Sequence, residues 1–232
     1  MARTAVIVIG GAPVDPRVLA HLPKDRVVVA ADSGFDRAVG LGLAVDLLVG
    51  DLDSVSRAGL AAAAAAGTSV ERHPADKDAT DTELAIEAAV RLGCTRLVGV
   101  SGGPCADARA PGETRLDHEL GAILAFSRPG IIAERVELWW GQAHLRVLHG
   151  PDRVDLAIPV GDLVSLLPLH GSAAGISTAG LRYPLRDETL APGTSRGVSN
   201  EVVATPASVG LARGTVLIVR PLALGGPPCP DD

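Results

Sequence analysis

Two stretches decide the fold of this chain, Val27-Val28-Val29-Ala30-Ala31-Asp32-Ser33-Gly34 and Leu47-Leu48-Val49-Gly50-Asp51-Leu52-Asp53-Ser54. Each begins as a short apolar run and ends in carboxylates beside small residues. Short apolar runs of this kind are typical of strands buried on both faces of a parallel sheet. In an open α/β sheet, ligands bind beyond the carboxyl ends of the strands. The two stretches therefore predict an α/β fold with a candidate site at that edge of the sheet.

The first 140 or so residues alternate strand-like and helix-like segments, which predicts a mostly parallel sheet built from βαβ units. The expected strands are Val6–Ile9, Val27–Ala31, Leu47–Val49, Leu97–Val100 and Val136–Trp140. The expected helices are Val14–Leu22, Gly34–Leu41, Ser56–Ala66, Asp81–Leu92 and Leu116–Phe126.

The pattern of apolar and polar residues changes after about residue 141. Short alternating runs follow, divided by Gly and Pro at positions such as Pro159, Pro168 and Gly171, and no helix of ten residues is expected among them. This pattern predicts an all-β sandwich domain. We therefore expect an α/β domain over 1–141, a β-sandwich domain over 142–222 and a disordered tail over 223–232.

Composition narrows the class of protein. The 232 residues carry a formal net charge of −6, and no Lys/Arg-rich stripe is available to neutralise nucleic-acid phosphates. The three cysteines lack CxxC spacing, so neither a disulfide framework nor a zinc site is expected. There is no signal-peptide pattern, and no apolar run approaches the roughly 20 residues that span a bilayer. We expect a cytoplasmic protein without nucleic-acid or membrane partners.

The carboxylates at the two strand ends suggest a site for Mg²⁺ and a polyphosphate. Mg²⁺ prefers a few carboxylates together with phosphate oxygens and water. Asp51 and Asp53 alternate in an extended segment, so a bend near Leu52 is needed for both to reach one ion. The alternative is that these Asp residues, with Asp32, are ordinary turn and N-cap residues. Taken together, the two stretches favour the Mg²⁺ and polyphosphate site over these structural roles.

Two further polar clusters precede expected helices. In the first, Lys77 could pair with a phosphate while Asp81 helps to hold the ion, although a capping box from Thr80 to Glu83 accounts for part of the pattern. In the second, residues 115–118, an Arg fork and a helix start could both bind an anion. The alternative is again a plain helix start with an exposed histidine.

The expected β domain contains one stretch suited to a small heteroaromatic molecule. It runs from Gly175 to Leu185, is rich in Gly, Ser and Thr, and holds Tyr183, the only tyrosine of the chain. Ser199-Asn200 follows it. The alternatives are that Tyr183 is a core residue and that Ser199-Asn200 is a turn.

Six motifs in this order make the chain resemble the thiamine pyrophosphokinase (thiamine diphosphokinase) family over about residues 5–220. One motif alone would be weak evidence for the family, but six motifs in the same order across both expected domains are specific to it. They are Asp32-Ser33-Gly34, Gly50-Asp51-Leu52-Asp53-Ser54, Lys77-Asp78-x-Thr80-Asp81-Thr82-Glu83-Leu84, Arg115-Leu116-Asp117-His118, Gly175-x-Ser177-Thr178-x-Gly180-Leu181-x-Tyr183-x-Leu185 and Ser199-Asn200.

The resemblance implies transfer of the pyrophosphoryl group of ATP to thiamine, with Mg²⁺, by a homodimer whose active site lies between subunits. It implies Asp51, Asp53 and Asp81 as metal ligands. It implies Lys77, Asp81, Arg115 and Asp117 as catalytic residues. The implied nucleotide-binding residues are Asp32, Ser33, Gly50, Asp78, Thr80 and His118, and the implied thiamine-binding residues are Tyr183, Ser199 and Asn200.

One segment departs from the family pattern. Many relatives have a compact Gly-Gly-Arg-Leu-Asp-His loop, whereas here a longer segment separates Gly102-Gly103 from Arg115, and Glu113-Thr114 stands where the relatives have the glycine pair.

Three other functions are alternatives to thiamine pyrophosphokinase activity. A pyrophosphokinase for another heterocyclic alcohol, such as a hydroxymethylpterin, is the nearest, and the Tyr183 and Ser199-Asn200 elements favour thiamine over it. A DxD metal-dependent nucleotide-sugar transferase would use Asp51-x-Asp53 but leaves the Asp81 and Asp117 clusters unexplained. A non-enzymatic nucleotide-sensing module is the third.

Overall fold

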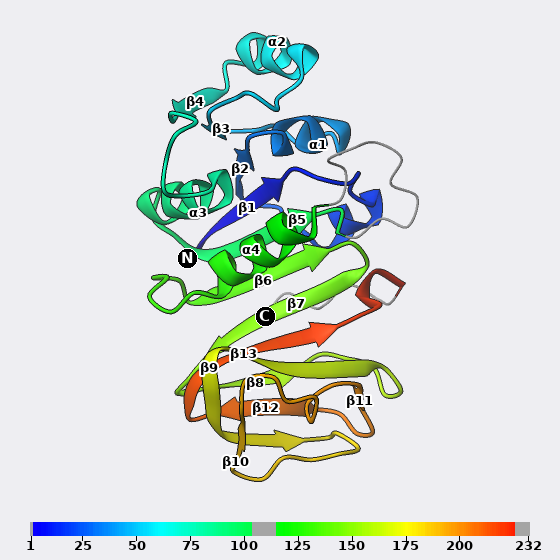
Figure 1. The fold of residues 1–232 in the computed structure, drawn as a ribbon. Coiled ribbons are helices and arrows are strands. Elements are labelled where there is room, and N and C mark those ends of the chain that lie inside the picture. The colour runs from blue at the N-terminus through cyan, green and yellow to red at the C-terminus, as the bar shows by residue number, and fades with distance from the viewer. Residues whose placement is uncertain (1, 104–114, 226–232) are drawn as a thin grey trace. The chain divides into compact units, whose positions relative to one another are not determined.

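The structure, a computed structural model, describes residues 2–103 and 115–225. The chain divides into two compact units, which are described one at a time (Figure 1). Unit 1 comprises residues 1–126 and 132–141, and unit 2 comprises residues 127–131 and 142–232.

Unit 1 is built on a parallel sheet, as the alternating pattern predicted. Every neighbouring pair of its described strands runs parallel. Apart from the edge strand Ser69–Arg72, the strands are buried along most of their length, as expected for a parallel sheet whose strands alternate with helices. Their spatial order is β4 (Ser69–Arg72), β3 (Leu47–Gly50), β2 (Val27–Ala31), β1 (Arg3–Ile9), β5 (Cys94–Ser101) and β6 (Arg135–Trp140).

Four α-helices connect these strands, close to where the sequence predicted them: α1 (Gly34–Gly40), α2 (Arg57–Ala66), α3 (Asp81–Arg91) and α4 (Leu116–Ser127). Side-chain caps set two of the starts. The Ser56 hydroxyl accepts a hydrogen bond from the Gly59 N–H, and Thr80 forms a full capping box with Glu83. Gly67, at φ 67°, ends α2 in the left-handed conformation that favours glycine.

Two details of unit 1 differ from the prediction. The helix expected over Val14–Leu22 is a shorter 3₁₀ helix, η1 (Pro16–His21), in which only Val18 is buried. A proline fixes the first turn, and one buried side chain gives the segment little reason to extend. Strand β4 was not expected, because its sequence Ser-Val-Glu-Arg is largely polar, as suits the exposed edge of a sheet.

The core of unit 1 is made mainly of Ala, Val, Leu and Ile, with Phe35 and Phe126 among its largest fully buried side chains. Gly99 in β5 makes room for the second ring, because a Cβ at this position would lie 2.8 Å from Phe126 Cζ. Because the chain has few aromatic residues, its core is filled by small and branched aliphatic side chains that pack closely against the sheet.

Unit 2 is antiparallel throughout its described strand pairs, as expected for a β sandwich. Its strands are β7 (Ala143–His149), β8 (Asp152–Leu156), β9 (Leu163–Ala179), β10 (Glu188–Leu190), β11 (Asn200–Glu201), β12 (Ala207–Leu211) and β13 (Arg213–Arg220). The long strand β9 joins the two layers (Figure 1). Its first half pairs with β13 and its last residues pair with β12, and one apolar cluster fills the space between.

Strand β9 corrects the prediction, which placed breaks at Pro168 and Gly171. Pro168 lies opposite Val216 of β13, while β11 covers the other edge of β9 only at Leu163 and Val164. Proline is tolerated at such an edge because no partner there needs its missing N–H. Gly171, at φ 135°, and Gly175, at φ 70°, bend the strand instead of ending it.

The prediction of a disordered tail from residue 223 is wrong for the first three residues of that tail. A 3₁₀ turn, η2 (Ala223–Gly225), is present, with Ala223 and Leu224 buried and the Leu224 N–H donating to the Gln142 carbonyl. The rest of that tail lies outside the described residues. In the described part of the chain, no helix has both the length and the apolar character that crossing a membrane requires.

Helix α1 provides a stability test with a matched control. A Cβ at Gly34 would lie 2.1 Å from the Val8 carbonyl oxygen of β1, whereas a Cβ at Gly40, in the same helix, would meet nothing within 4 Å. We expect Gly34→Ala to lower the free energy of unfolding by about 1–3 kcal/mol through overpacking. Gly40→Ala should leave it unchanged or raise it by up to about 1 kcal/mol.

Urea unfolding followed by circular dichroism measures both changes. Equal stabilities for the two alanine variants would show that α1 does not pack against β1 as closely as described.

Candidate active site

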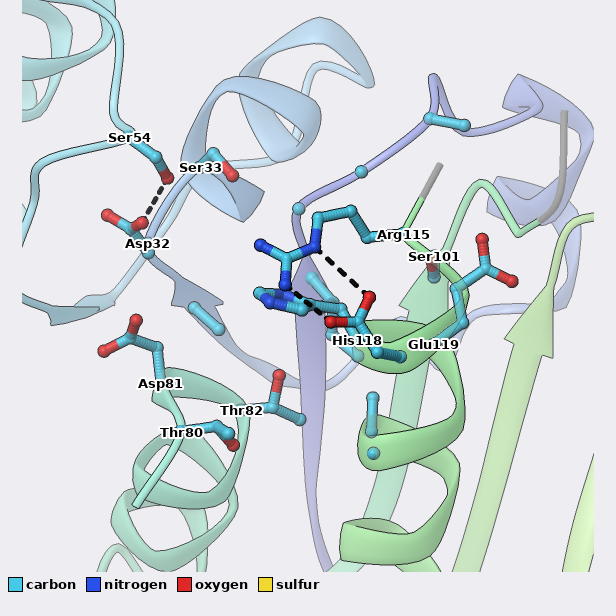
Figure 2. Close-up of a pocket in the computed structure, with 18 of the residues that line it drawn as sticks. Asp32, Ser33, Ser54, Thr80, Asp81, Thr82, Ser101, Arg115, His118 and Glu119 are labelled. Atoms are coloured by element: carbon cyan, nitrogen blue, oxygen red, sulfur yellow. Dashed lines mark hydrogen bonds and ion pairs between the residues drawn. The ribbon is translucent and has the colours of Figure 1, made fainter. Parts of the chain in front are cut away.

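A cavity of about 560 Å³ opens at the carboxyl ends of the strands of unit 1. Its walls come from the last residues of β1, β2, β5 and β6, from the segments after β1, β2, β3 and β4, and from the N-terminal halves of α3 and α4 (Figure 2). This is the edge at which the sequence placed a candidate site, and most of the lining residues are polar or small. Of the predicted residues, the lining includes Asp32, Ser33, Lys77, Thr80, Asp81, Arg115, Asp117 and His118.

Three carboxylates converge beside this cavity. Asp32, Asp51 and Asp53 each place one carboxylate oxygen within 4.8 Å of the others. The bend that the sequence required is present, because Leu52 adopts a left-handed conformation at φ 71° and the Asp53 N–H donates back to Asp51 Oδ1 at 3.1 Å. In a regular strand, residues i and i+2 share a face but lie about 6.5 Å apart along the chain, so the bend brings the two carboxylates closer together.

Asp32 is the most buried member of this cluster, with a relative exposure of 9%. One of its oxygens accepts a hydrogen bond from the Ser54 hydroxyl, while the other, Oδ1, is buried and has no hydrogen-bond partner among the described residues (Figure 2). Burial raises the pKa of Asp32, and the neighbouring carboxylates add to the rise, whereas the Ser54 hydrogen bond opposes it. The negative charge at this position is costly without a cation.

Asp81 approaches the same region from the first turn of α3, as Figure 2 shows. Gly50, at φ 148°, makes this approach possible: a Cβ there would lie 3.1 Å from both Asp32 Cβ and Asp81 Oδ1. Asp81 lies outside the group of three that share the 4.8 Å limit. The geometry therefore brings Asp32 closer to Asp51 and Asp53 than the sequence indicated, with Asp81 beside them.

Lys77 links the two sides of the acidic region. Its Nζ lies 3.0 Å from Asp51 Oδ2 and 3.1 Å from Asp81 Oδ1. Partial burial alone would lower the pKa of Lys77, but the two ion pairs outweigh burial and raise it. Lys77 therefore stays charged and offsets part of the negative charge around it.

The electrostatics separate Asp51 from Asp53. The backbone N–H of Asp53 and the ammonium of Lys77 hold the pKa of Asp51 below its ordinary value. The charge of Asp51 raises the pKa of Asp53. The DxD pair thus presents one stabilised carboxylate and one exposed carboxylate that is repelled by its neighbours.

Arg115 and Asp117 form an exposed pair at the start of α4. Arg115 donates to both carboxylate oxygens of Asp117, at 3.2 and 2.5 Å, and this contact lowers the pKa of Asp117 to about 2. His118, also exposed, lines the same wall of the cavity (Figure 2). Both members of the pair are solvent-accessible, so an incoming anion can reach the guanidinium.

Other predicted residues have structural roles or lie elsewhere. Asp78 is exposed and does not line the cavity. The Thr80 hydroxyl, although in the wall, caps α3. Gly102, at the start of the segment that departs from the family pattern, allows close backbone packing, because a Cβ there would lie 2.3 Å from the Ala12 carbonyl oxygen. The segment from Cys105 to Thr114, which departs from the family pattern, lies outside the described residues.

The sequence analysis missed several lining residues. Gly10 and Gly11 follow β1, and a Cβ at Gly10 would lie 2.2 Å from Ser33 Oγ. A glycine pair directly after the first apolar strand was the signal that could have identified them. Ser54, the last residue of the Gly50–Ser54 motif, also lines the cavity. Ser101, Glu119 and Trp140 line it too, but isolated residues of these types carry no local signal.

In unit 2, the predicted thiamine-binding residues lie close together. Tyr183 is 65% exposed, so the alternative that it is a core residue is wrong. Asn200 is buried, and its side-chain amide bonds to the backbone N–H and carbonyl of Tyr183. Ser199 is exposed, adopts φ 58°, and donates its backbone N–H to Ser165 Oγ.

Comparison with known proteins follows the same two-part division. Residues 19–139 match the model of the thiamin pyrophosphokinase catalytic domain, which is more than half of the chain. Residues 151–216 match the model of the thiamin pyrophosphokinase vitamin B1 binding domain.

Individual relatives are distant in sequence but similar over nearly their full length. The chain is 22% identical to the thiamine pyrophosphokinase of Bacillus subtilis (strain 168), over 94% of this chain and 98% of that protein. A crystal structure of thiamine pyrophosphokinase from Bacillus subtilis superposes with a TM-score of 0.77 at 21% identity, covering 94% of this chain and 98% of the other. The thiamin pyrophosphokinase of Candida albicans gives 0.72 at 13% identity, covering 94% and 88%. The chain belongs to the thiamin pyrophosphokinase family.

Proposed function

We propose that the cavity of unit 1 binds ATP with Mg²⁺ and is where this thiamine pyrophosphokinase transfers the pyrophosphoryl group to the hydroxyethyl oxygen of thiamine. The family models support the activity itself. One observation carries the location of the reaction: three carboxylates converge to within 4.8 Å at the strand ends, beside a cavity large enough for a nucleotide.

The residues present fit a Mg²⁺ ion. Asp32 Oδ1 is buried and has no hydrogen-bond partner among the described residues, and the neighbouring donors are carboxylate oxygens, which Mg²⁺ prefers. We assign Asp51 and Asp53 as ligands, with Asp32 and Asp81 flanking them. Mg²⁺ held there would neutralise charge on the phosphate oxygens and polarise the transferred group.

Two cations of the chain would orient the polyphosphate. Lys77 is held at the cavity by Asp51 and Asp81, and Arg115 is exposed in the part of the wall formed by the start of α4. Phosphoryl transfer depends mainly on positioning and on neutralising charge, so cations on two sides of the polyphosphate suit the reaction.

The bonding changes follow from the products. The thiamine oxygen forms a bond to the β-phosphorus of ATP, and the bond from that phosphorus to the oxygen bridging the α-phosphate breaks, so AMP leaves with the bridging oxygen. A carboxylate accepts the proton of the thiamine alcohol. Asp81 and Asp117 are the candidates for this role, and the Arg115 contact that lowers the pKa of Asp117 to about 2 weakens Asp117 as a base.

Tyr183 supplies the aromatic face for thiamine. The residue is 65% exposed, while its backbone N–H and carbonyl are both held by the Asn200 side chain. Thiamine is cationic, and a cation over an aromatic face is attracted by the ring. We also infer a cytoplasmic homodimer, on the family resemblance of the motifs.

Charge removal at the DxD pair tests the location of the reaction. Asp51→Asn and Asp53→Asn should each lower thiamine-dependent AMP formation from ATP by more than tenfold, a loss of over about 1.4 kcal/mol of transition-state stabilisation. Each change removes charge at a strand end without removing core volume, so circular dichroism should show an intact fold. Asp25→Asn, at an exposed turn away from the cavity, is the matched control and should keep full activity.

Two results would contradict the proposal. One is a folded DxD variant that keeps more than a tenth of the wild-type rate. The other is AMP formation by the wild-type enzyme at the same rate with and without thiamine.

Substitution of Tyr183 tests the thiamine side. Tyr183→Ala should raise the KM for thiamine by roughly tenfold, equal to the loss of about 1–2 kcal/mol of cation–aromatic attraction, and should change the KM for ATP much less. Tyr183→Trp should be tolerated because a larger ring offers the same face. Steady-state kinetics with each substrate varied in turn measures the difference, and an unchanged thiamine KM in Tyr183→Ala would exclude stacking.

A further inference from the structure

Asn200 has a buried side chain that is fully engaged with one neighbouring segment. Its relative exposure is 5%, and its backbone pairs with Val164 of β9 as part of β11. The side-chain Oδ1 accepts the Tyr183 N–H at 3.0 Å, and the side-chain Nδ2 donates to the Tyr183 carbonyl at 2.7 Å. Both ends of the amide therefore bond to the backbone of the same residue.

This arrangement reproduces a backbone pairing with a side chain. An asparagine amide carries the same donor and acceptor as a peptide group, so Asn200 gives Tyr183 the two bonds that a neighbouring strand residue would give. The pairing beside it is made by backbone: Leu181 bridges Val202, and the Arg182 N–H donates to the Glu201 carbonyl at 2.9 Å. The Asn200 side chain thus extends this short ladder to Tyr183.

Oδ1 has a second role that fixes the amide in place. It also accepts the Glu201 N–H at 2.9 Å, so the acceptor end is held by two backbone donors. With its acceptor doubly used and its donor directed at the Tyr183 carbonyl, the side chain faces the protein backbone. Tyr183, in contrast, is 65% exposed as a residue.

We propose that Asn200 is a positioning residue for thiamine binding, which acts by clamping the Tyr183 backbone so that the ring is presented in one orientation. The inference rests on the proposed thiamine contact of Tyr183. It changes the part assigned to Asn200, from a direct contact with thiamine to a contact made through another residue. An aromatic ring on a rigid backbone binds better because less freedom is lost on binding.

A double-mutant cycle tests the clamp. Asn200→Ala in the wild-type background should raise the KM for thiamine by roughly fivefold to tenfold and leave the KM for ATP nearly unchanged. In the Tyr183→Ala background the same change should raise it less than about twofold, because the ring that the clamp positions is gone. The melting temperature should fall equally in both backgrounds, since the backbone bonds at residue 183 are present in both.

The near-isosteric variant Asn200→Asp separates the two roles by sign. A carboxylate keeps the acceptor for the Tyr183 N–H but repels the Tyr183 carbonyl, so the clamp predicts a higher KM for thiamine. A direct contact predicts the reverse, because a carboxylate attracts the cationic substrate. Asn200→Asp also keeps the test valid should Asn200→Ala fail to fold. Arg182→Ala removes only the exposed ion pair with Glu201 and is the control, expected to leave both KM values unchanged.

Each outcome has a distinct meaning. Additive KM effects in the cycle, or a lower KM for thiamine in Asn200→Asp, would overturn the clamp while leaving the role of Tyr183 intact. An unchanged KM in Tyr183→Ala alone would instead remove the proposed contact on which the inference rests.

Discussion

The candidate site depends on the repulsion among carboxylates at the strand ends of unit 1. Asp32, Asp51 and Asp53 bring oxygens within 4.8 Å of one another, and one of the three side chains is buried. Like charges this close destabilise the fold unless something opposes them. Lys77 and the Ser54 hydroxyl offset part of the cost, but Asp32 Oδ1 has no hydrogen-bond partner among the described residues. A divalent cation would offset the rest.

Unusual backbone conformations place side chains in both units. Asp32, at φ 47°, and Leu52, at φ 71°, turn the chain sharply after β2 and β3, and Ser199, at φ 58°, does so before Asn200. Residues other than glycine rarely adopt this left-handed backbone conformation, and those that do are found disproportionately at functional sites. In unit 1 the turns direct carboxylates toward one another. In unit 2 the turn leads into the residue whose amide holds Tyr183.

Much of the fold could be predicted because local patterns and packing agree. Apolar runs marked β2 and β3 almost to the residue, and Ser56 and Thr80 marked the starts of two helices. Strand β4 carried no apolar signal, since an edge strand can be polar. The full length of β9 could not be predicted, because a proline and a glycine such as Pro168 and Gly171 usually end a strand. Pro168 is tolerated within β9 because it lies at an edge where no partner needs its N–H.

The site was predictable in part for a similar reason. The DxD pair and the bend at Leu52 follow from the local sequence, and so do the charged starts of α3 and α4. How deeply Asp32 is buried, the contact of Lys77 with two carboxylates, and the engagement of the Asn200 amide with Tyr183 depend on segments that are distant in sequence. Glu119 and Trp140 also line the cavity, but no sequence motif predicted them.

Thermal unfolding of the wild type and of Asp32→Asn, each with EDTA and with Mg²⁺, tests the cation site most directly. Asparagine keeps an acceptor for the Ser54 hydroxyl while removing a buried negative charge. We predict that Asp32→Asn melts at a higher temperature than the wild type in EDTA, and that Mg²⁺ stabilises the wild type by mass action but the variant much less. A variant that is less stable in EDTA, or equal stabilisation of both proteins by Mg²⁺, would contradict the account.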